Sequence, residues 1–317
     1  MSIEIYAKAA LQHDQIDAKK SIGCNGIEIQ LLGELIDGFL GHYKNIEDAF
    51  DMESLIDEPV SVVHAPILSG VGDMTIEQMC DMGDCKLFYE TCRLANMFGE
   101  RQNKMITVVV HSETFMGFIQ GLGDTLDRIV SHTLTALKAY PYIKIGIENV
   151  SPLRGIGKGG SLHLANNFKF DNVDLAKYLR ENLPTKRVGT VLDTCHAMLA
   201  KKYIDCLYKE VGDREPEDLS MEAYFKENQE TIFLIHLCDI HGSGYGKGRH
   251  GVPFTLETAS KCRDILRLYK KYNYNCPITL EVEETDFLDP QGYAQTKIIV
   301  DDFFNSNNIM VNAINRL

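Results

Sequence analysis

Side chains that can bind a metal follow short apolar stretches at several places in this chain of 317 residues. The stretch VGTVLDTCHAML (188–199) begins as an apolar run and then reaches Asp193 and His196. A protein core has no use for either group, because an unpaired charge is costly to bury and a buried imidazole needs a hydrogen bond or a metal. Five other apolar stretches lead in the same way into His64, His111, Glu148, His236 and Glu281.

Carboxylates dominate the first group of candidate ligands. Three carboxylates and one imidazole form a hard, oxygen-rich set, which suits manganese, magnesium or cobalt and tolerates zinc. A structural residue at the polar rim of a strand is the alternative for any one of them, but polar residues at the ends of six successive strands favour a site. The first group comprises Glu148, Asp193, His236 and Glu281.

Histidines make up the second group. Four imidazoles beside the first group would form a nitrogen-rich second metal site, of the kind that zinc prefers. His196 follows Asp193 by three residues, so both can face one site if the chain turns directly after the strand. The second group comprises His64, His111, His196 and His250.

Two glycine-rich segments stand next to these residues. GIGKGGS (155–161) and GSGYGKGRHG (242–251) offer backbone N–H groups and cationic side chains, although neither has the GK[ST] spacing of a P-loop. Barrel enzymes often bind phosphate near the ends of the seventh and eighth strands. A surface loop without function is the alternative for each segment. We expect four side chains to hold the substrate, namely His196, Arg249, Lys158 and Lys247.

The elements that must position these residues are short β-rich runs, each followed by helical periodicity. Several runs are continuous in Val, Ile and Leu, as in parallel strands that are covered on both faces. Eight βα units in a chain of this length are typical of one (β/α)8 TIM barrel, here a single domain over residues 1–317. A doubly wound sheet is the alternative, but no GxGxxG motif follows the first strand. The expected strands cover residues 3–7, 26–31, 60–64, 106–111, 143–148, 188–193, 232–236 and 278–283.

Apolar residues three and four positions apart predict helices between the strands. The pattern indicates helices over 74–99, with Gly99 as the C-cap, over 125–140 and over 255–272. In a parallel barrel the carboxyl ends of all strands meet at one mouth, where the active sites of such barrels are built. This fold would therefore bring the candidate residues together.

Composition narrows the class of protein. The chain is 44% hydrophobic and 24% charged, has a formal net charge of −13, and contains no apolar stretch that approaches a membrane span. An acidic chain disfavours nucleic acid, since phosphate contacts need Lys and Arg. Its nine cysteines form no CxxC pair and its N-terminus lacks a signal-peptide pattern, so we expect reduced thiols in a cytoplasmic protein. We expect neither a membrane nor a nucleic-acid partner, and a homo-oligomer stays open.

Six sequence elements resemble, in their order, those of the superfamily of xylose-isomerase-like TIM barrels, namely VVHAPI, VVVHSE, IGIENVS, VLDTCHA, IHLCD and ITLEVE. This superfamily includes sugar and sugar-phosphate isomerases and epimerases, and also endonuclease IV. The epimerase-like pattern implies that the first group of residues binds a metal. It also implies that Glu148 and Glu281 act as acid and base, and that His196 contacts the substrate.

The endonuclease-like pattern implies different chemistry. It uses the same four ligands and adds histidines of the second group and a DRH element, whose Asp and His bind a third metal. Here that element reads GRH (248–250), so His250 is present but Gly248 replaces the Asp. The missing carboxylate and the acidic composition both argue against cleavage of a phosphodiester.

We therefore expect a divalent-metal-dependent isomerase or epimerase of a small sugar, ketose, polyol or sugar phosphate. The metal would chelate a carbonyl and a neighbouring hydroxyl and stabilise the enediolate formed. Glu148 and Glu281 would take and return the proton, with Glu283 as the alternative proton carrier. The other functions left open are an endonuclease IV-like zinc phosphodiesterase acting on abasic DNA, another lyase or hydrolase, and a metal-binding protein without catalysis.

Overall fold

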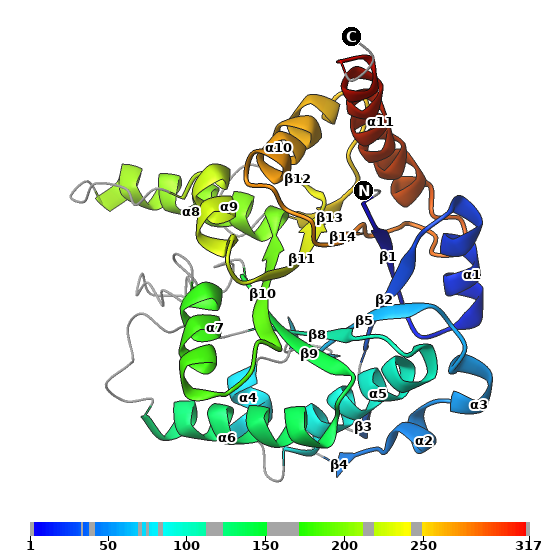
Figure 1. Cartoon of the computed structure of the whole chain (residues 1–317), viewed down its shortest axis with the longest axis vertical. Helices are drawn as coiled ribbons and strands as arrows, with labels where there is room; N and C mark the ends of the chain where they lie inside the picture. The colour runs from blue at the N-terminus through cyan, green and yellow to red at the C-terminus, as the bar shows by residue number, and fades with distance from the viewer. Residues whose placement is uncertain are drawn as a thin grey trace.

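Eight parallel strands close into a barrel in the computed structural model of the chain (Figure 1). The structure describes residues 3–32, 34–37, 42–68, 72–73, 76–81, 85–111, 123–150, 171–211, 219–241 and 249–314. Each strand pairs with the next one in the chain, and the last strand pairs with the first to close the sheet. The barrel strands are β1 (Ile5–Ala9), β2 (Gly26–Gln30), β5 (Val60–His64), β8 (Ile106–His111), β9 (Ile143–Glu148), β10 (Val188–Asp193), β11 (Ile232–Leu237) and β14 (Ile278–Leu280).

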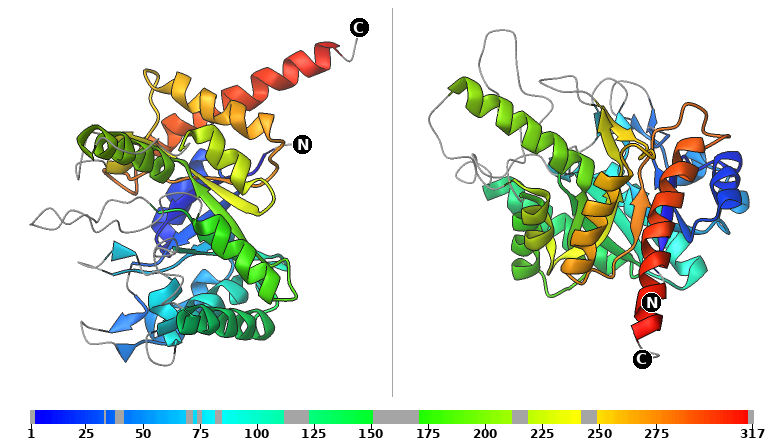
Figure 2. Two further views of the ribbon diagram at one scale, coloured as in Figure 1. Left: turned by 90° about the vertical axis from the view of Figure 1, so that its left-hand side faces the viewer. Right: turned by 90° about the horizontal axis from the view of Figure 1, so that it is seen from above.

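Helices surround this barrel on its outside, and α8 and α11 extend outward from it (Figures 1 and 2). The longer helices are α1 (His13–Ile22), α5 (Lys86–Gln102), α6 (Gly123–Ala139), α7 (Asp171–Asn182), α8 (Thr194–Val211), α9 (Met221–Asn228), α10 (Ala259–Lys271) and α11 (Gln291–Ile314). Short elements complete the fold, namely α2 (Ile46–Ala49), α3 (Met52–Leu55), α4 (Ile76–Asp81) and the antiparallel pairs β3 (Ile36–Asp37) with β4 (His42–Tyr43), β6 (Ile67–Leu68) with β7 (Gly72–Asp73), and β12 (Asp239–His241) with β13 (Arg249–Val252). Among the described helices, none is long and apolar enough to cross a membrane.

The eight predicted strands are confirmed, with one shift that matters for the site. The first strand was expected over 3–7 but runs from Ile5 to Ala9. Its ladder begins where Ile5 pairs with Ile278 of β14, so the strand reaches further toward the mouth of the barrel. As a result β1 includes Lys8, which the predicted range left out.

The predicted helices are found with changed ends. The pattern over 74–99 is divided between α4 and α5, and Cys85, which precedes α5, has a left-handed backbone with a φ of 55°. The helix expected over 125–140 is α6, and the one expected over 255–272 is α10, which begins at Ala259. None of the cysteines in the described part of the chain forms a disulfide.

The prediction that Gly99 is a C-cap was wrong. Helix α5 continues to Gln102, and Asn103, with a φ of 50°, takes the left-handed C-cap position. A Cβ atom added at Gly99 would lie 2.5 Å from the Cβ of Tyr142 and 2.9 Å from the carbonyl oxygen of Lys104. Gly99 is therefore needed where α5 packs closely against the chain that enters β9.

A layer of apolar side chains closes the barrel interior beneath the candidate site. Side chains two residues apart on a strand point to the same face. Each member of the layer lies two residues before a charged or imidazole side chain near the end of its strand, so the polar residues stand directly above the apolar ones. The layer is one cluster of buried side chains, namely Tyr6, Val62, Val109, Val191 and Leu234.

Candidate active site

The first group of residues surrounds one point at the mouth of the barrel. Its ligand-capable oxygen and nitrogen atoms all lie within 4.8 Å of one another, and all four residues are buried. The Nδ1 atom of His236 lies 3.1 Å from Oε1 of Glu148 and 2.8 Å from Oε2 of Glu281. The residues come from the ends of four strands that are neighbours in the sheet, namely Glu148 (β9), Asp193 (β10), His236 (β11) and Glu281 (directly after β14).

The charges of the two glutamates are stabilised by nearby cations. Burial by itself raises the pKa of Glu148, but the positive charges of His236 and His111 outweigh it and hold that pKa well below its usual range. Burial acts on Glu281 in the same direction, and Lys8 and His236 hold the pKa of this carboxyl well below its usual range. Both side chains are therefore carboxylates at neutral pH.

Asp193 uses one oxygen to fix the local chain and leaves the other directed into the site. Its Oδ1 accepts hydrogen bonds from the backbone N–H groups of Cys195 (2.6 Å) and His196 (3.0 Å), which caps α8. Its backbone N–H donates to Oδ1 of Asn149 at 2.8 Å, and the Asn149 side-chain amide donates to its carbonyl oxygen at 2.9 Å. The chain thus turns into α8 at the end of the strand, which places His196 beside Asp193.

The donor set fits a divalent cation. Oδ2 of Asp193 is buried and accepts no hydrogen bond from the described residues. His196 Nδ1 is 3.3 Å away, but it donates its proton to the carbonyl oxygen of Asn149 at 2.8 Å. Burial raises the pKa of Asp193, and His196 offsets only part of that rise. A cation among three carboxylates and an imidazole would satisfy the unpartnered oxygen and the surplus negative charge.

The second group is brought to the mouth as a row of imidazoles. Ring centroids are 5.0 Å apart for His64 and His111, 6.0 Å for His111 and His196, and 5.5 Å for His196 and His250. His64 and His111 form one metal-capable group with Glu148, whose Oε2 lies 3.1 and 3.3 Å from their Nε2 atoms. Among the described residues no metal-capable group joins all four histidines, which the sequence placed in one nitrogen-rich site, because His196 and His250 belong to a different group.

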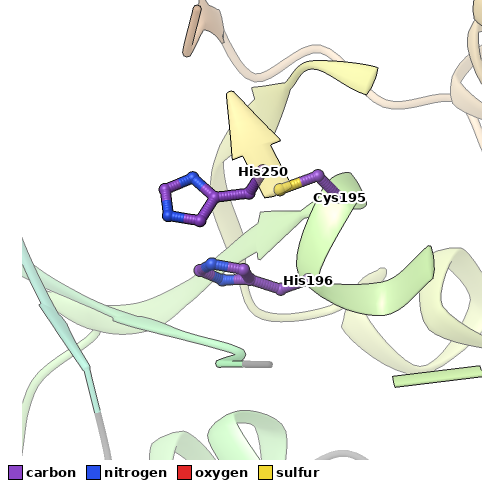
Figure 3. A group of neighbouring side chains, drawn as sticks. All are labelled: Cys195, His196 and His250. Carbon is purple, nitrogen blue, oxygen red and sulfur yellow. The ribbon is translucent and has the colours of Figure 1, made fainter. Parts of the chain in front are cut away.

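The other pair stands beside a cysteine at the start of α8. Figure 3 shows His196 from α8 and His250 from β13 with their rings close together and the Cys195 thiol next to them. The ligand atoms of these three residues lie within 4.8 Å of one another. Burial raises the pKa of the Cys195 thiol well above its usual range, which disfavours the thiolate that metals bind. The two imidazoles are therefore better candidate metal ligands than the Cys195 thiol.

Sequence reasoning missed two charged residues of the site because it considered only strands three to eight. Lys8 on β1 forms a salt bridge with Glu281 and lies 3.9 Å from Oε1 of Glu28 on β2. Glu28 is fully buried, and its Oε2 lies 3.0 Å from Nε2 of His236. A signal was present in the stretch GIEIQ, where a single charge stands between buried isoleucines. All eight strands contribute to the arrangement.

A cavity of about 250 Å³ opens above these residues, which is near the lower limit of about 300 Å³ for small-molecule sites. Its rim includes the exposed side chains of Leu32 and Phe287. Apolar atoms form most of its exposed wall, but several polar and ionisable side chains face it and could contact the hydroxyl groups of a small molecule. These side chains include Lys8, Gln30, His111, His196, His250 and Glu281.

The four residues expected to hold substrate are placed unequally. His196 lines the cavity. Arg249 begins β13, where its backbone pairs with that of His241. Lys158 and Lys247 lie outside the described residues.

The alternative proton carrier Glu283 does not continue strand β14. The strand ends at Leu280, and the backbone N–H of Glu283 donates to the carbonyl oxygen of Gly251 at 2.7 Å. Its side chain is exposed and lies at the rim of the cavity. Glu281, by contrast, is buried and contacts His236 directly.

Comparison with known proteins gives a family and a set of related folds. The sequence profile of the family described as "xylose isomerase-like TIM barrel" matches residues 16–298. Similar solved structures include an L-ribulose 3-epimerase, with 9% identity over 99% of this chain and 98% of that chain and a TM-score of 0.58. A D-tagatose 3-epimerase-like protein has 16% identity over 98% and 100% of the two chains and a TM-score of 0.55.

A third structure is that of the IOLI protein with a bound zinc atom, with 12% identity over 94% of this chain and 99% of that chain and a TM-score of 0.54. At such identities these likenesses show the fold. No curated protein matches the chain by sequence.

Proposed function

We propose that this chain, which belongs to the xylose isomerase-like TIM barrel family, is a divalent-metal-dependent isomerase or epimerase of a small sugar or sugar derivative. The observation that carries the proposal is the convergence of Glu148, Asp193, His236 and Glu281 beside a small cavity. The similarity in fold to an L-ribulose 3-epimerase and to a D-tagatose 3-epimerase-like protein supports the substrate class.

The first group would hold the metal, and its composition suits manganese, magnesium, cobalt or zinc. The zinc atom in the structure of the IOLI protein supports a metal in barrels of this fold. When bound, such a cation polarises a sugar carbonyl and offsets the negative charge that develops as the neighbouring carbon loses its proton. The ligand residues would be Glu148, Asp193, His236 and Glu281.

The two glutamates divide the proton chemistry. Glu281 lines the cavity, so its carboxylate can reach a substrate C–H bond and act as the first base. Glu148 is fully buried beneath it, among His64, His111 and His236. Its carboxyl is ionised in the free site, so it would first have to take up a proton from water or a substrate hydroxyl. Its position on another strand would then let it return that proton from a different side, as a change of configuration or a transfer between carbons requires.

The other polar side chains that line the cavity would orient the substrate. The Nδ1 proton of His196 is donated to the carbonyl oxygen of Asn149, so the Nε2 lone pair is left for a substrate hydroxyl. Lys8 is the cation nearest to Glu281 and can contact hydroxyl oxygens at the cavity wall. Arg249, Lys158 and Lys247 would contribute if the substrate carries a phosphate.

A zinc phosphodiesterase acting on abasic DNA is a second candidate. The row of four histidines favours it, because the pairs His64–His111 and His196–His250 could hold further metals. The composition disfavours it, since Gly248 stands where the endonuclease-like pattern has an Asp and the net charge is −13. We therefore rank the isomerase or epimerase first.

Exchange of solvent deuterium tests the first candidate. Manganese-loaded protein is incubated with ribulose, tagatose, fructose and their phosphates in deuterated water, and the sugars are analysed by mass spectrometry and NMR. Incorporation of deuterium at a carbon next to the carbonyl, together with a second sugar as product, is expected for one of these ketoses. Metal-loaded protein that catalyses no exchange with any ketose but cleaves abasic DNA would reverse the ranking.

A further inference from the structure

We propose that Glu28 is a positioning residue that holds the imidazole of His236 with its Nδ1 atom toward the candidate metal site. The inference rests on the proposed function, because it assigns Glu28 a role toward one of the proposed ligands. It adds a residue from β2 to a site whose proposed ligands all come from the ends of β9, β10, β11 and β14.

The His236 ring lies between carboxylates on two sides. Its Nε2 is 3.0 Å from Oε2 of Glu28, and its Nδ1 is 3.1 Å from Oε1 of Glu148 and 2.8 Å from Oε2 of Glu281. Glu28 and His236 are both completely buried, so solvent does not compete for either nitrogen. The ring therefore presents one nitrogen to the ligand group and the other to Glu28.

The chemistry of metal binding requires this division of the two nitrogens. An imidazole binds a cation through an unprotonated nitrogen, so the neutral ring must carry its proton on the other one. A carboxylate beside Nε2 favours the tautomer with the proton there and prevents the ring from exchanging its two faces by rotation. Outer partners of this kind fix both the tautomer and the orientation of a ligating histidine.

Glu28 has no other evident partner in the described part of the chain except one lysine. Among the described residues, neither of its oxygens accepts a hydrogen bond of regular geometry, so the 3.0 Å approach of His236 Nε2 is an ion-pair contact, and Lys8 lies 3.9 Å from Oε1. A buried carboxylate without a partner is strongly destabilising, so its position beside a ring nitrogen calls for an explanation. Orientation of His236, with Lys8 balancing the charge, accounts for the position.

Metal affinity tests the role, with three variants. Glu28→Gln keeps the shape and one oxygen acceptor, whereas Glu28→Leu removes every acceptor. Glu58→Gln is the matched control, because Glu58 is also a buried glutamate facing a histidine and a lysine, with Oε1 2.7 Å from His13 Nδ1 and Oε2 3.2 Å from Lys20 Nζ. Dissociation constants for Mn²⁺ and Zn²⁺ are measured by chelator competition, and folding is checked by circular dichroism.

Glu28→Leu is expected to weaken binding by about 10–100-fold, Glu28→Gln by less, and Glu58→Gln not at all. Nitrogen-15 NMR of the zinc-loaded protein gives a second readout, with the His236 signals assigned by their loss in His236→Asn. Wild type should show a protonated Nε2 and an unprotonated Nδ1 at His236, and Glu28→Leu should lose that pattern. If Glu28→Leu does not fold, the same comparison is made with Glu28→Gln.

Two different failures can be told apart. Folded Glu28 variants with wild-type affinity and unchanged His236 signals would overturn the positioning role and leave the proposed function standing. Wild-type protein that binds neither Mn²⁺ nor Zn²⁺ would overturn the metal site and this role together. Equal weakening in Glu58→Gln would show a general effect of losing a buried carboxylate and would also overturn the role.

Discussion

Lys8 forms a salt bridge with Glu281 across the seam at which β1 pairs with β14 and closes the barrel. Seven of the eight strands lie between these two residues in the chain, yet they are neighbours in the closed sheet. The proposed base is therefore held by the first strand, and its negative charge is balanced inside the cavity wall.

This salt bridge predicts the pH dependence of turnover. Lys8 lowers the pKa of Glu281, so Glu281 stays ionised to lower pH than an isolated carboxyl in the same buried place. In Lys8→Met that pKa rises, and the acid limb of the kcat/KM profile should move to higher pH by about one to three units. Lys20→Met, at a lysine paired with Asp17 on the surface, is the control and should leave the profile unchanged. An acid limb that stays in place in Lys8→Met would contradict the assignment.

Metal content should follow the carboxylates of the first group. Wild type is expected to bind at least one divalent metal per chain. Glu148→Gln or Asp193→Asn should weaken metal binding by more than roughly 10–100-fold, which is the effect of losing a residue that only positions a ligand. Asp193→Asn keeps the oxygen that caps α8, so the fold should survive. Elemental analysis after loading and dialysis measures this. Full occupancy in both variants would show that the metal binds elsewhere.

Loss of basicity at Glu281 should separate turnover from binding. Glu281→Gln keeps the shape but not the charge, so we expect no measurable turnover and some remaining substrate binding, measured by calorimetry with the ketose that exchanges deuterium. His196→Ala should mainly raise KM, because its imidazole is proposed to contact hydroxyls without transferring a proton. Deuterium exchange at the wild-type rate in Glu281→Gln would show that Glu281 does not transfer the proton, and would point to Glu283 at the rim.

Abasic DNA should not be cleaved efficiently. Gly248 removes a carboxylate that the endonuclease-like pattern uses, and the chain has a net charge of −13, so phosphate contacts are few. Zinc-loaded protein is assayed on a duplex with one abasic site. Efficient incision by wild type that is lost in His64→Ala would place the nuclease first.

The barrel and the position of the first group could be predicted because strand ends are local in sequence but converge in space. A run such as VGTVLD ends in Asp193 wherever its neighbours are, and closure of the barrel then brings the ends together. Lys8 and Glu28 could not be recognised in this way, since each stands one or two residues before the end of its strand. Their roles depend on β1 and β2 meeting β14 and β11 across the mouth, which only the closed sheet shows.

The spacing within the second group was also beyond sequence reasoning. The sequence places a histidine at a strand end at the mouth of the barrel, but the direction of its ring depends on side-chain hydrogen bonds. Nδ1 of His64 donates to the carbonyl oxygen of Ala65 at 3.0 Å, which turns Nε2 toward Glu148. His196 is held by Asn149 instead, so the four rings form a row of two pairs.

The packing role of Gly99 predicts a loss of stability on the smallest substitution. Alanine gains about 1 kcal/mol over glycine inside a helix, whereas overpacking costs about 1–3 kcal/mol. At Gly99 the new Cβ would lie 2.5 Å from the Cβ of Tyr142 and 2.9 Å from a backbone oxygen, neither of which can move aside easily. The free energy of unfolding of Gly99→Ala, from urea titration, should therefore fall, by up to about 2 kcal/mol.

Asn103 supplies the companion test, because it occupies the C-cap with a φ of 50°. A left-handed backbone costs a residue other than glycine about 1–2 kcal/mol, so Asn103→Gly should leave the free energy of unfolding equal or higher. Asn103→Ala should lower it, since alanine has neither the freedom of glycine nor the tolerance of asparagine for this conformation.

If Gly99→Ala is instead more stable than wild type, the chain around Tyr142 moves aside easily, and helix propensity, not close packing, decides the residue at position 99.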